Sequence, residues 1–377
     1  MTSLITDNQA LAAYCQQVAD SKLLALDTEF IRQSTFLPKL GLIQLFDGKA
    51  LALVDPLTIS DWQPLQRLCA NTAVVKLLHS CSEDLDALAT IGINQISPLF
   101  DTQLAAELLG WGASVGYARL VEQLSGEVLD KSESRTDWLA RPLSETQLRY
   151  AANDVHFLYP LYDKLCQLLS TQHKALLLQE GEQLMRRRAQ QIPLAFKYLE
   201  IKNSWQLSPR ELAVLRELTA WRYNYAVEKD LALGLILKDI QLVELAKRRP
   251  ATAESLLNVP GLPPREIRRH AKTLVELISE AKAIPIEQCP QRFYHQHDFA
   301  GYKETTEQLS KAIKAAAAAQ QIPAEFLAVK RQLNEYLNWC WRVSDEQRAL
   351  LPVPEFMQGW RASLLLPFLP KPAHIGR

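Results

Sequence analysis

A short apolar stretch that ends in two acids contains the residues best suited to chemistry. Residues 23–30 read Leu-Leu-Ala-Leu-Asp-Thr-Glu-Phe, which predicts a strand. Because alternate side chains of a strand project from one face, Asp27 and Glu29 lie side by side and repel each other. A divalent cation relieves this repulsion, and oxygen-only ligands favour Mg²⁺, with Mn²⁺ as a substitute, over zinc. The alternatives are a solvent-exposed strand end or an Asp that caps the next turn.

Two further segments supply acids and a hydroxyl group. Ser82 can cap a helix that follows a predicted strand, which places Asp84 in the first turn, where the helix dipole favours an anion. Ser144 and Gln147 form a capping-box pattern that begins another helix, on which Tyr150 and Asp154 share a face. Capping alone would explain Asp84, whereas an Asp beneath a Tyr suits a metal ligand beside a hydroxyl that positions water. We interpret Asp101 as a helix cap and not as a further ligand.

The elements that must position these side chains alternate between strands and helices. An amphipathic helix at 7–21 precedes the strand at 23–30, and strands at 41–46 and 50–54, joined by an Asp-Gly turn, extend it to an antiparallel meander. Helices near 61–70, from 82 and at 102–109 alternate with strands at 73–79 and 97–100. The pattern predicts an α/β domain over residues 1–172, with a mixed sheet covered by helices.

The second half of the chain shows no convincing strand. Helix-period apolar stretches are separated by breaks that contain proline, as at Val259-Pro260-Gly261. The pattern predicts a helical linker at 173–204 and all-α modules at 205–287 and 295–370.

Composition limits the class of protein. A chain of 377 residues with 48% hydrophobic and 22% charged residues is typical of two or three soluble globular units. The N-terminus lacks a signal-peptide pattern, and no apolar run is long enough to cross a membrane, so we expect a cytoplasmic protein. The 6 cysteines are scattered without a C-x-x-C pair, which favours free thiols.

A net charge of zero conceals an asymmetry between the two halves. Residues 1–170 contain 12 basic and 20 acidic side chains, whereas residues 171–377 contain 30 basic and 22 acidic ones. An acidic half that concentrates cations beside a basic half that attracts phosphate suits phosphodiester chemistry, so the asymmetry indicates a nucleic-acid partner. The alternative is a chance imbalance between solvated surfaces.

The order and context of the acids resemble the tyrosine-bearing branch of the DEDD superfamily of 3′–5′ exonucleases. Asp27-x-Glu29, Asp84 and Tyr150-x-x-x-Asp154 resemble its three motifs, and longer stretches between residues 24 and 160 resemble the ribonuclease D family. Residues 218–261 resemble the HRDC module, and 323–367 resemble a divergent second copy. The resemblance implies a ribonuclease-H-like exonuclease domain followed by HRDC modules at 205–287 and 295–370.

The resemblance also implies roles for individual residues. Asp27, Glu29, Asp84 and Asp154 would hold two divalent metal ions, Mg²⁺ or Mn²⁺, and Tyr150 would orient the attacking water. Asp27 is the candidate to bridge both ions. The implied reaction releases 5′-mononucleotides from RNA with a free 3′ end, with tRNA precursors as the expected substrate.

Substrate contacts and the remaining alternatives rest on weaker patterns. We expect RNA contacts from Lys131 and Arg135 in a loop rich in hydroxyl and charged groups, although a solvated loop would look the same. Basic clusters in the first HRDC module extend this set, with a solvated helix face as the alternative: Arg248, Arg249, Arg265, Arg268 and Arg269. A DNA exonuclease and a non-catalytic RNA-binding scaffold remain open as functions. A monomer is favoured, because modules of one chain could already encircle a strand.

Overall fold

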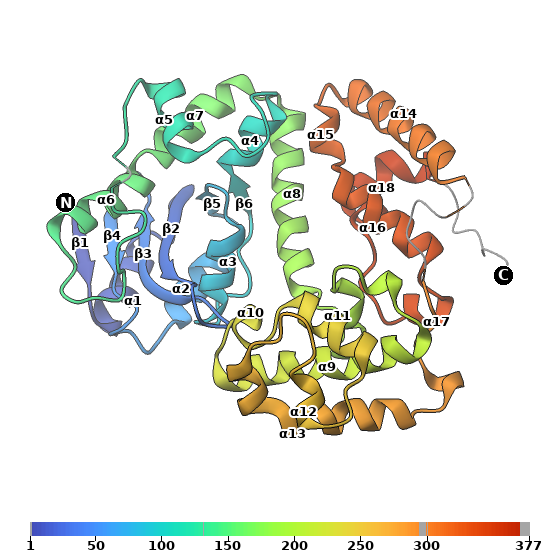
Figure 1. Ribbon diagram of the computed structural model, residues 1–377. Coiled ribbons are helices and arrows are strands. Elements are labelled where there is room, and N and C mark those ends of the chain that lie inside the picture. The colour runs from blue at the N-terminus through green and yellow to red at the C-terminus, as the bar shows by residue number, and fades with distance from the viewer. Residues whose placement is uncertain (1, 131, 294–298, 300, 370–377) are drawn as a thin grey trace.

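A six-stranded mixed sheet forms the first part of the molecule (Figure 1). The structure is a computed structural model and describes residues 2–130, 132–293, 299 and 301–369. Its strand order is β1-β4-β3-β2-β5-β6. The strands are β1 (Thr2–Ile5), β2 (Leu23–Ile31), β3 (Lys39–Phe46), β4 (Leu51–Val54), β5 (Val75–Leu78) and β6 (Leu99–Asp101).

The centre of the sheet is the predicted antiparallel meander. β2 pairs antiparallel with β3, and β3 pairs antiparallel with β4. On the other side of β2, β5 and then β6 are added in parallel. The edge strand β1, which pairs in parallel with β4, was not predicted. It has only four residues, and its partner lies almost 50 residues further along the chain, so no local pattern reveals it.

Helices cover both faces of this sheet. One face packs on α1, α2 and α3, and the other on α4, α6 and α7. The helices of this α/β domain are α1 (Asn8–Gln17), α2 (Gln63–Ala70), α3 (Ser82–Ala89), α4 (Thr102–Leu108), α5 (Tyr117–Ser125), α6 (Glu145–His156) and α7 (Leu158–Leu168).

Beyond residue 172, the described part of the chain contains helices and no strand, as predicted. A long helix, α8 (Thr171–Ala189), leads out of the α/β domain. The helices that follow are α9 (Pro209–Lys229), α10 (Leu233–Ile236), α11 (Asp239–Arg248), α12 (Ala253–Leu256), α13 (Pro264–Ala283), α14 (Tyr302–Gln320), α15 (Ala324–Leu327), α16 (Lys330–Trp341), α17 (Asp345–Arg348) and α18 (Gly359–Leu365). None of the described helices is long and apolar enough to span a membrane.

The two helical units differ in how they are held. Helices α9 to α13 enclose a hydrophobic core of their own. In contrast, buried residues of α14 to α18, such as Leu309 and Trp360, belong to the same core as Leu42 and Phe100 of the sheet. The last unit in sequence therefore packs back onto the α/β domain, with α8 between them (Figure 1).

Helix α8 fits closely against both neighbours. A Cβ atom at Gly181 would lie 2.2 Å from the carbonyl oxygen of Leu99 in β6, so only glycine allows this approach. The adjacent Glu180 is buried, accepts a hydrogen bond of 2.8 Å from the indole N–H of Trp360, and pairs with Arg361. These contacts connect the sheet and the last helical unit through one turn of α8.

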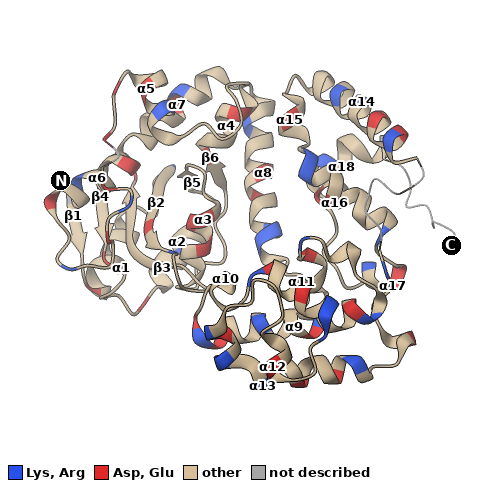
Figure 2. Ribbon diagram, viewed as in Figure 1, with Lys and Arg blue, Asp and Glu red and all other residues tan. Residues whose placement is uncertain are grey.

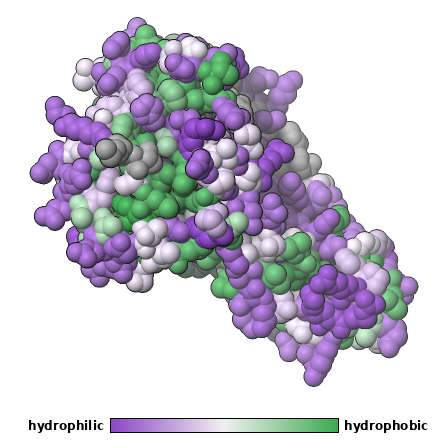
Figure 3. Space-filling model, turned by 90° about the vertical axis from the view of Figure 1, so that its left-hand side faces the viewer, coloured by the Kyte–Doolittle hydropathy of each residue, from purple (hydrophilic) through white to green (hydrophobic). Residues whose placement is uncertain are grey.

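Surface properties vary between the units. Lys and Arg are interleaved with Asp and Glu over α9 to α13, so this unit has no face of a single charge sign in the view of Figure 2. Apolar residues gather on the face of the α/β domain that Figure 3 shows. A hollow of about 500 Å³ lies at the β1 edge of the sheet, between β4 and α6, and is lined by Leu4, Leu51, Leu53, Leu148 and Ala152 among others. All six cysteines are free thiols, as predicted.

Candidate active site

Three acids from two elements meet on the α6 face of the sheet. Asp27 and Glu29 project from β2, and Asp154 comes from α6, which packs across that strand. One carboxylate oxygen of each residue lies within 4.8 Å of the others. The strand periodicity explains the first pair, and the packing of α6 adds the third acid.

The start of α6 is fixed by the predicted capping box. The backbone N–H of Gln147 donates to the Ser144 hydroxyl at 3.1 Å, and the Gln147 amide oxygen accepts from the Ser144 N–H at 3.0 Å. From this fixed start, Tyr150 and Asp154 follow on one face, one turn apart. The cap therefore sets the rotation that directs Asp154 toward β2.

Asp84 lies beside this group and not within it. Its buried carboxylate accepts a hydrogen bond of 2.5 Å from the hydroxyl of Thr28, the residue between Asp27 and Glu29. Asp84 is in the first turn of α3, as predicted, but the prediction that Ser82 caps this helix was wrong. Cys81 occupies the cap position without a side-chain bond, and Ser82 is already helical.

The turn before α3 is held by the carboxylate of Asp101. The backbone N–H groups of Ser80 and Cys81 donate to the carboxylate of Asp101, each at 3.0 Å. The same carboxylate accepts from the N–H of Gln103 at 2.8 Å and so caps α4, which confirms its predicted role as a cap. One buried acid thus accepts hydrogen bonds both from the turn that precedes α3 and from the first turn of α4.

The acids of the cluster hold their protons more firmly than ordinary carboxyl groups. Burial, then Asp84, Asp154 and Glu29, raise the pKa of Asp27 well above its usual range. Burial and the neighbouring acids raise the pKa of Glu29 to about 9, that of Asp154 to about 7 and that of Asp84 to about 6. Ionising the whole cluster requires a counter-charge, and a set of carboxylate oxygens fits a hard divalent cation.

Tyr150 stands within electrostatic reach of the acids. Burial, then Asp154, Glu29 and Asp27, raise its pKa above the usual range, so the phenol keeps its proton and can donate a hydrogen bond. Its ring contacts Trp138 with centroids 6.1 Å apart. Trp138 is almost fully buried and packs against Gly41 of β3, where a Cβ atom would lie 2.7 Å from its carbonyl oxygen.

Two residues near the cluster were missed at the level of sequence. The Tyr117 hydroxyl lies 2.6 Å from the carbonyl oxygen of Asp154 and 3.2 Å from that of Asn153, so it fixes the last turn of α6. The Thr28 hydroxyl donates to the side-chain carboxylate of Asp84. Their partners lie 36 to 56 residues away along the chain, so spacing gives no signal for either.

The residues predicted to contact substrate are not brought into the acid cluster. Arg135 is exposed on the loop before α6, and Lys131 lies outside the described residues. The five arginines of the first HRDC module lie in the separate unit of α9 to α13: Arg248, Arg249, Arg265, Arg268 and Arg269. Some pair with local acids, as Arg248 does with Glu244 at 3.2 Å and Arg269 with Glu266 at 3.8 Å.

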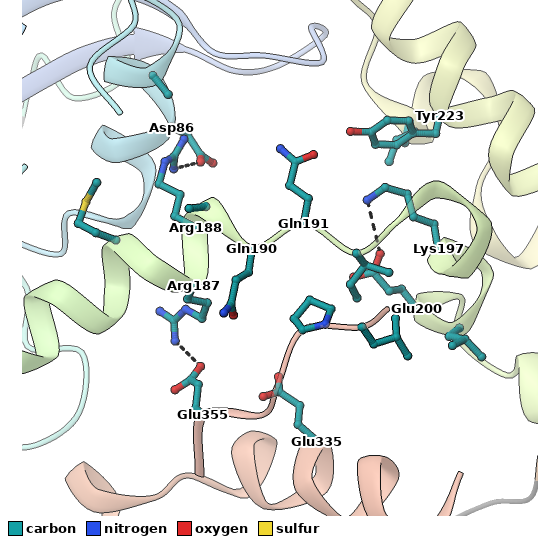
Figure 4. A pocket seen from close by; sticks show the side chains of 18 of the residues that line it. Asp86, Arg187, Arg188, Gln190, Gln191, Lys197, Glu200, Tyr223, Glu335 and Glu355 are labelled. Carbon is teal, nitrogen blue, oxygen red and sulfur yellow. Dashed lines mark hydrogen bonds and ion pairs between the residues drawn. The ribbon is translucent and has the colours of Figure 1, made fainter. Parts of the chain in front are cut away.

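A cavity of about 1310 Å³ lies where the three units meet, around the end of α8 (Figure 4). Adjacent arginines at this end point in different directions. Arg188 pairs with Asp86 of α3, whereas Arg187 pairs with Glu355 at 2.7 Å, in the segment before α18. The cavity therefore contains ion pairs that join the α/β domain and the last helical unit to α8.

Family models match all three units. A model described as a 3′–5′ exonuclease matches residues 2–170. A model of the HRDC domain matches residues 211–278, and one of the ribonuclease D C-terminal HRDC domain matches residues 300–368. These matches confirm the predicted architecture of an α/β exonuclease domain followed by helical HRDC modules.

Similarity to curated relatives and to a solved structure extends over the whole chain. Ribonuclease D of Shewanella sp. (strain ANA-3) is 41% identical over 97% of this chain and 93% of the relative. Ribonuclease D of Escherichia coli (strain K12) is 40% identical over 96% of both chains. The crystal structure of Escherichia coli RNase D, described as an exoribonuclease, superposes with a TM-score of 0.88 over 97% of both chains at 39% identity. The chain therefore belongs to the ribonuclease D family of exoribonucleases.

Proposed function

We propose that this enzyme is a metal-dependent 3′–5′ exoribonuclease that removes 5′-mononucleotides from RNA by a two-metal-ion mechanism. The observation that carries the proposal is the convergence of Asp27, Glu29 and Asp154, with Asp84 held beside them by Thr28. The similar Escherichia coli protein is described as acting in structured RNA processing. By that similarity, we infer that the substrate is structured RNA with a free 3′ end, such as a tRNA precursor, and that the enzyme works as a cytoplasmic monomer.

The proposed roles follow the positions of the side chains. Asp27, Glu29, Asp84 and Asp154 would hold two divalent ions, Mg²⁺ or Mn²⁺. When bound, the ions would stabilise the negative charge that develops during phosphodiester cleavage. Tyr150 keeps its proton and therefore orients the attacking water as a hydrogen-bond donor. The hydrogen bond from Thr28 fixes the orientation of the Asp84 carboxylate beside the other three acids.

An assay of substrate and metal dependence tests this function. RNA and DNA strands of one sequence, labelled at the 5′ end, are incubated with Mg²⁺, Mn²⁺ or EDTA. We expect stepwise shortening of RNA from its 3′ end with either metal and none with EDTA. Shortening of DNA at an equal rate would favour a DNA exonuclease, and RNA binding without any metal-dependent product would favour a scaffold.

Substitution of single acids tests the assigned ligands. Asp27→Asn and Asp154→Asn keep the side-chain shape but remove charge, so kcat should fall by roughly 10³-fold, the scale of losing one charge-stabilising group. Asp163→Asn, an exposed acid of α7 in the same domain, is the matched control and should leave kcat within about twofold. Wild-type turnover in either cluster variant would refute the assignment.

A further inference from the structure

Gln44 is a polar residue in the interior of the sheet. It is completely buried in β3, and neither its amide nitrogen nor its amide oxygen has a hydrogen-bond partner among the described residues. An unpaired buried polar group costs about 1–3 kcal/mol. The other buried residues of β3 are apolar, so hydrophobic packing alone does not account for an amide at this position.

The strand register identifies the side chains that Gln44 can reach. Its directly opposed residues are Asp27 on β2 and Leu53 on β4. Along β3, Leu42 and Phe46 share its face, because side chains alternate. Of these four neighbours, only Asp27 has a polar side chain. Directly opposed Cβ atoms lie about 4.5–5.5 Å apart, a gap that a glutamine amide spans.

The packing above Gln44 leaves Asp27 as its polar neighbour. Ala151 and Val155 of α6 cover this face and belong to the same core as Leu42 and Leu53. Asp27 itself is partly exposed, whereas Gln44 is completely buried. Gln44 is thus more deeply buried than Asp27, Glu29 and Asp154, which are all partly exposed.

We propose that Gln44 is a positioning residue for the metal site: its amide N–H, which has no partner in the described part of the chain, would donate to the opposed Asp27 carboxylate when that carboxylate binds a cation, and would fix its orientation toward Glu29 and Asp154. The inference rests on the proposed function, in which Asp27 is a metal ligand. A neutral amide orients the carboxylate without cancelling the negative charge that attracts cations, as a lysine or arginine would. Removing a residue that orients a metal ligand typically weakens metal binding by about 10–100-fold.

Mn²⁺ binding to the full-length chain without RNA, measured by calorimetry, tests this role. Gln44→Met keeps the length of the side chain and removes the amide that would donate to Asp27. We expect the Mn²⁺ Kd to rise about 10–100-fold and kcat to fall while the KM for RNA stays unchanged. The Tm of the metal-free protein should be equal or higher, because a buried amide is lost. An Mn²⁺ Kd within twofold of wild type would overturn the inference.

Controls separate this role from general destabilisation. Thr219→Val in α9 also removes a buried polar atom without a partner, but far from the acids in a different core, and should leave the Mn²⁺ Kd unchanged. An equal loss of affinity in Thr219→Val would contradict a specific role for Gln44. If Gln44→Met does not fold, Gln44→Asn, whose amide is one methylene shorter, replaces it with the same expectation. A wild-type chain that binds no Mn²⁺ contradicts the proposed function itself, whereas normal wild-type binding with an unaffected Gln44 variant contradicts only this inference.

Discussion

Glu29 shows at the level of one residue how the acid cluster works against the stability of the metal-free fold. Burial, then Asp154 and Asp84, raise its pKa from 4.5 to about 9. Between these two values the folded chain binds more protons than the unfolded chain does. The free energy of unfolding therefore falls as the pH rises through this range, since the folded state must either keep the proton or hold a buried charge.

This sign gives a prediction for the metal-free enzyme. In EDTA, the free energy of unfolding of wild type, measured in urea, should fall between about pH 5 and pH 9. In Glu29→Gln this decrease with pH should be smaller, and turnover should be abolished. Near pH 9, added Mg²⁺ should restore most of the stability that wild type loses, and it should raise the stability of Glu29→Gln only a little. A variant that keeps the full wild-type slope would show that Glu29 does not titrate in this way.

Local periodicity predicted the acids but not the residues that hold them. Asp27 and Glu29 follow from the strand period, and Tyr150 and Asp154 from a capped helix. Gln44 gave a weak signal, as a polar residue in an apolar strand, but only the register places it opposite Asp27. Contacts such as that between Tyr117 and Asp154 depend on tertiary packing, which no spacing encodes.

At the level of elements, α8 depends on one glycine. Gly181→Ala would place a methyl group 2.2 Å from the Leu99 carbonyl oxygen, so α8 must move away from β6. We expect destabilisation of about 1–3 kcal/mol, as for other overpacked sites, measured by urea denaturation. Gly234→Ala in α10 is the control, because its Cβ meets no atom within 4 Å, and it should be neutral or slightly stabilising. Equal effects of both changes would contradict the close fit of α8.

At the level of the whole molecule, ion pairs at the end of α8 join units that are distant in sequence. Burial alone would raise the pKa of Glu355, but hydrogen bonds and charge from Arg187, with Gln332 and Arg361, lower it to about 2. Its stabilising contribution is therefore present above its usual pKa of 4.5 and is lost as the pH falls toward about 2.

Removing this charge should loosen the last helical unit. Glu355→Gln removes the charge that pairs with Arg187 and Arg331. We expect a loss of about 1–3 kcal/mol, below the value of a fully buried pair because both arginines are partly exposed. Hydrogen exchange in α18 should become faster. Glu182→Gln, which breaks an exposed pair with Arg186 within α8, is the control and should change stability by less than about 0.5 kcal/mol. Unchanged exchange in α18 of Glu355→Gln would show that the pair does not hold the unit.

The sequence indicated three units but not how they share their cores. Composition and periodicity separated the α/β domain from the helices, because both signals are local. The common core of Leu42, Phe100, Leu309 and Trp360 joins residues more than 200 positions apart, and only the packed structure shows it.

That common core has a consequence for how the protein is made. A ribosome releases the sheet and α8 long before residues 302–365 are synthesised, so the apolar surface that Trp360 and its neighbours later cover stays exposed to water or chaperones in the meantime. A newly made chain that stops short of α18 would leave the carboxylate of Glu180 facing that surface without Trp360 and Arg361. Incomplete chains should therefore aggregate or be degraded, and native nuclease would form only once translation is finished.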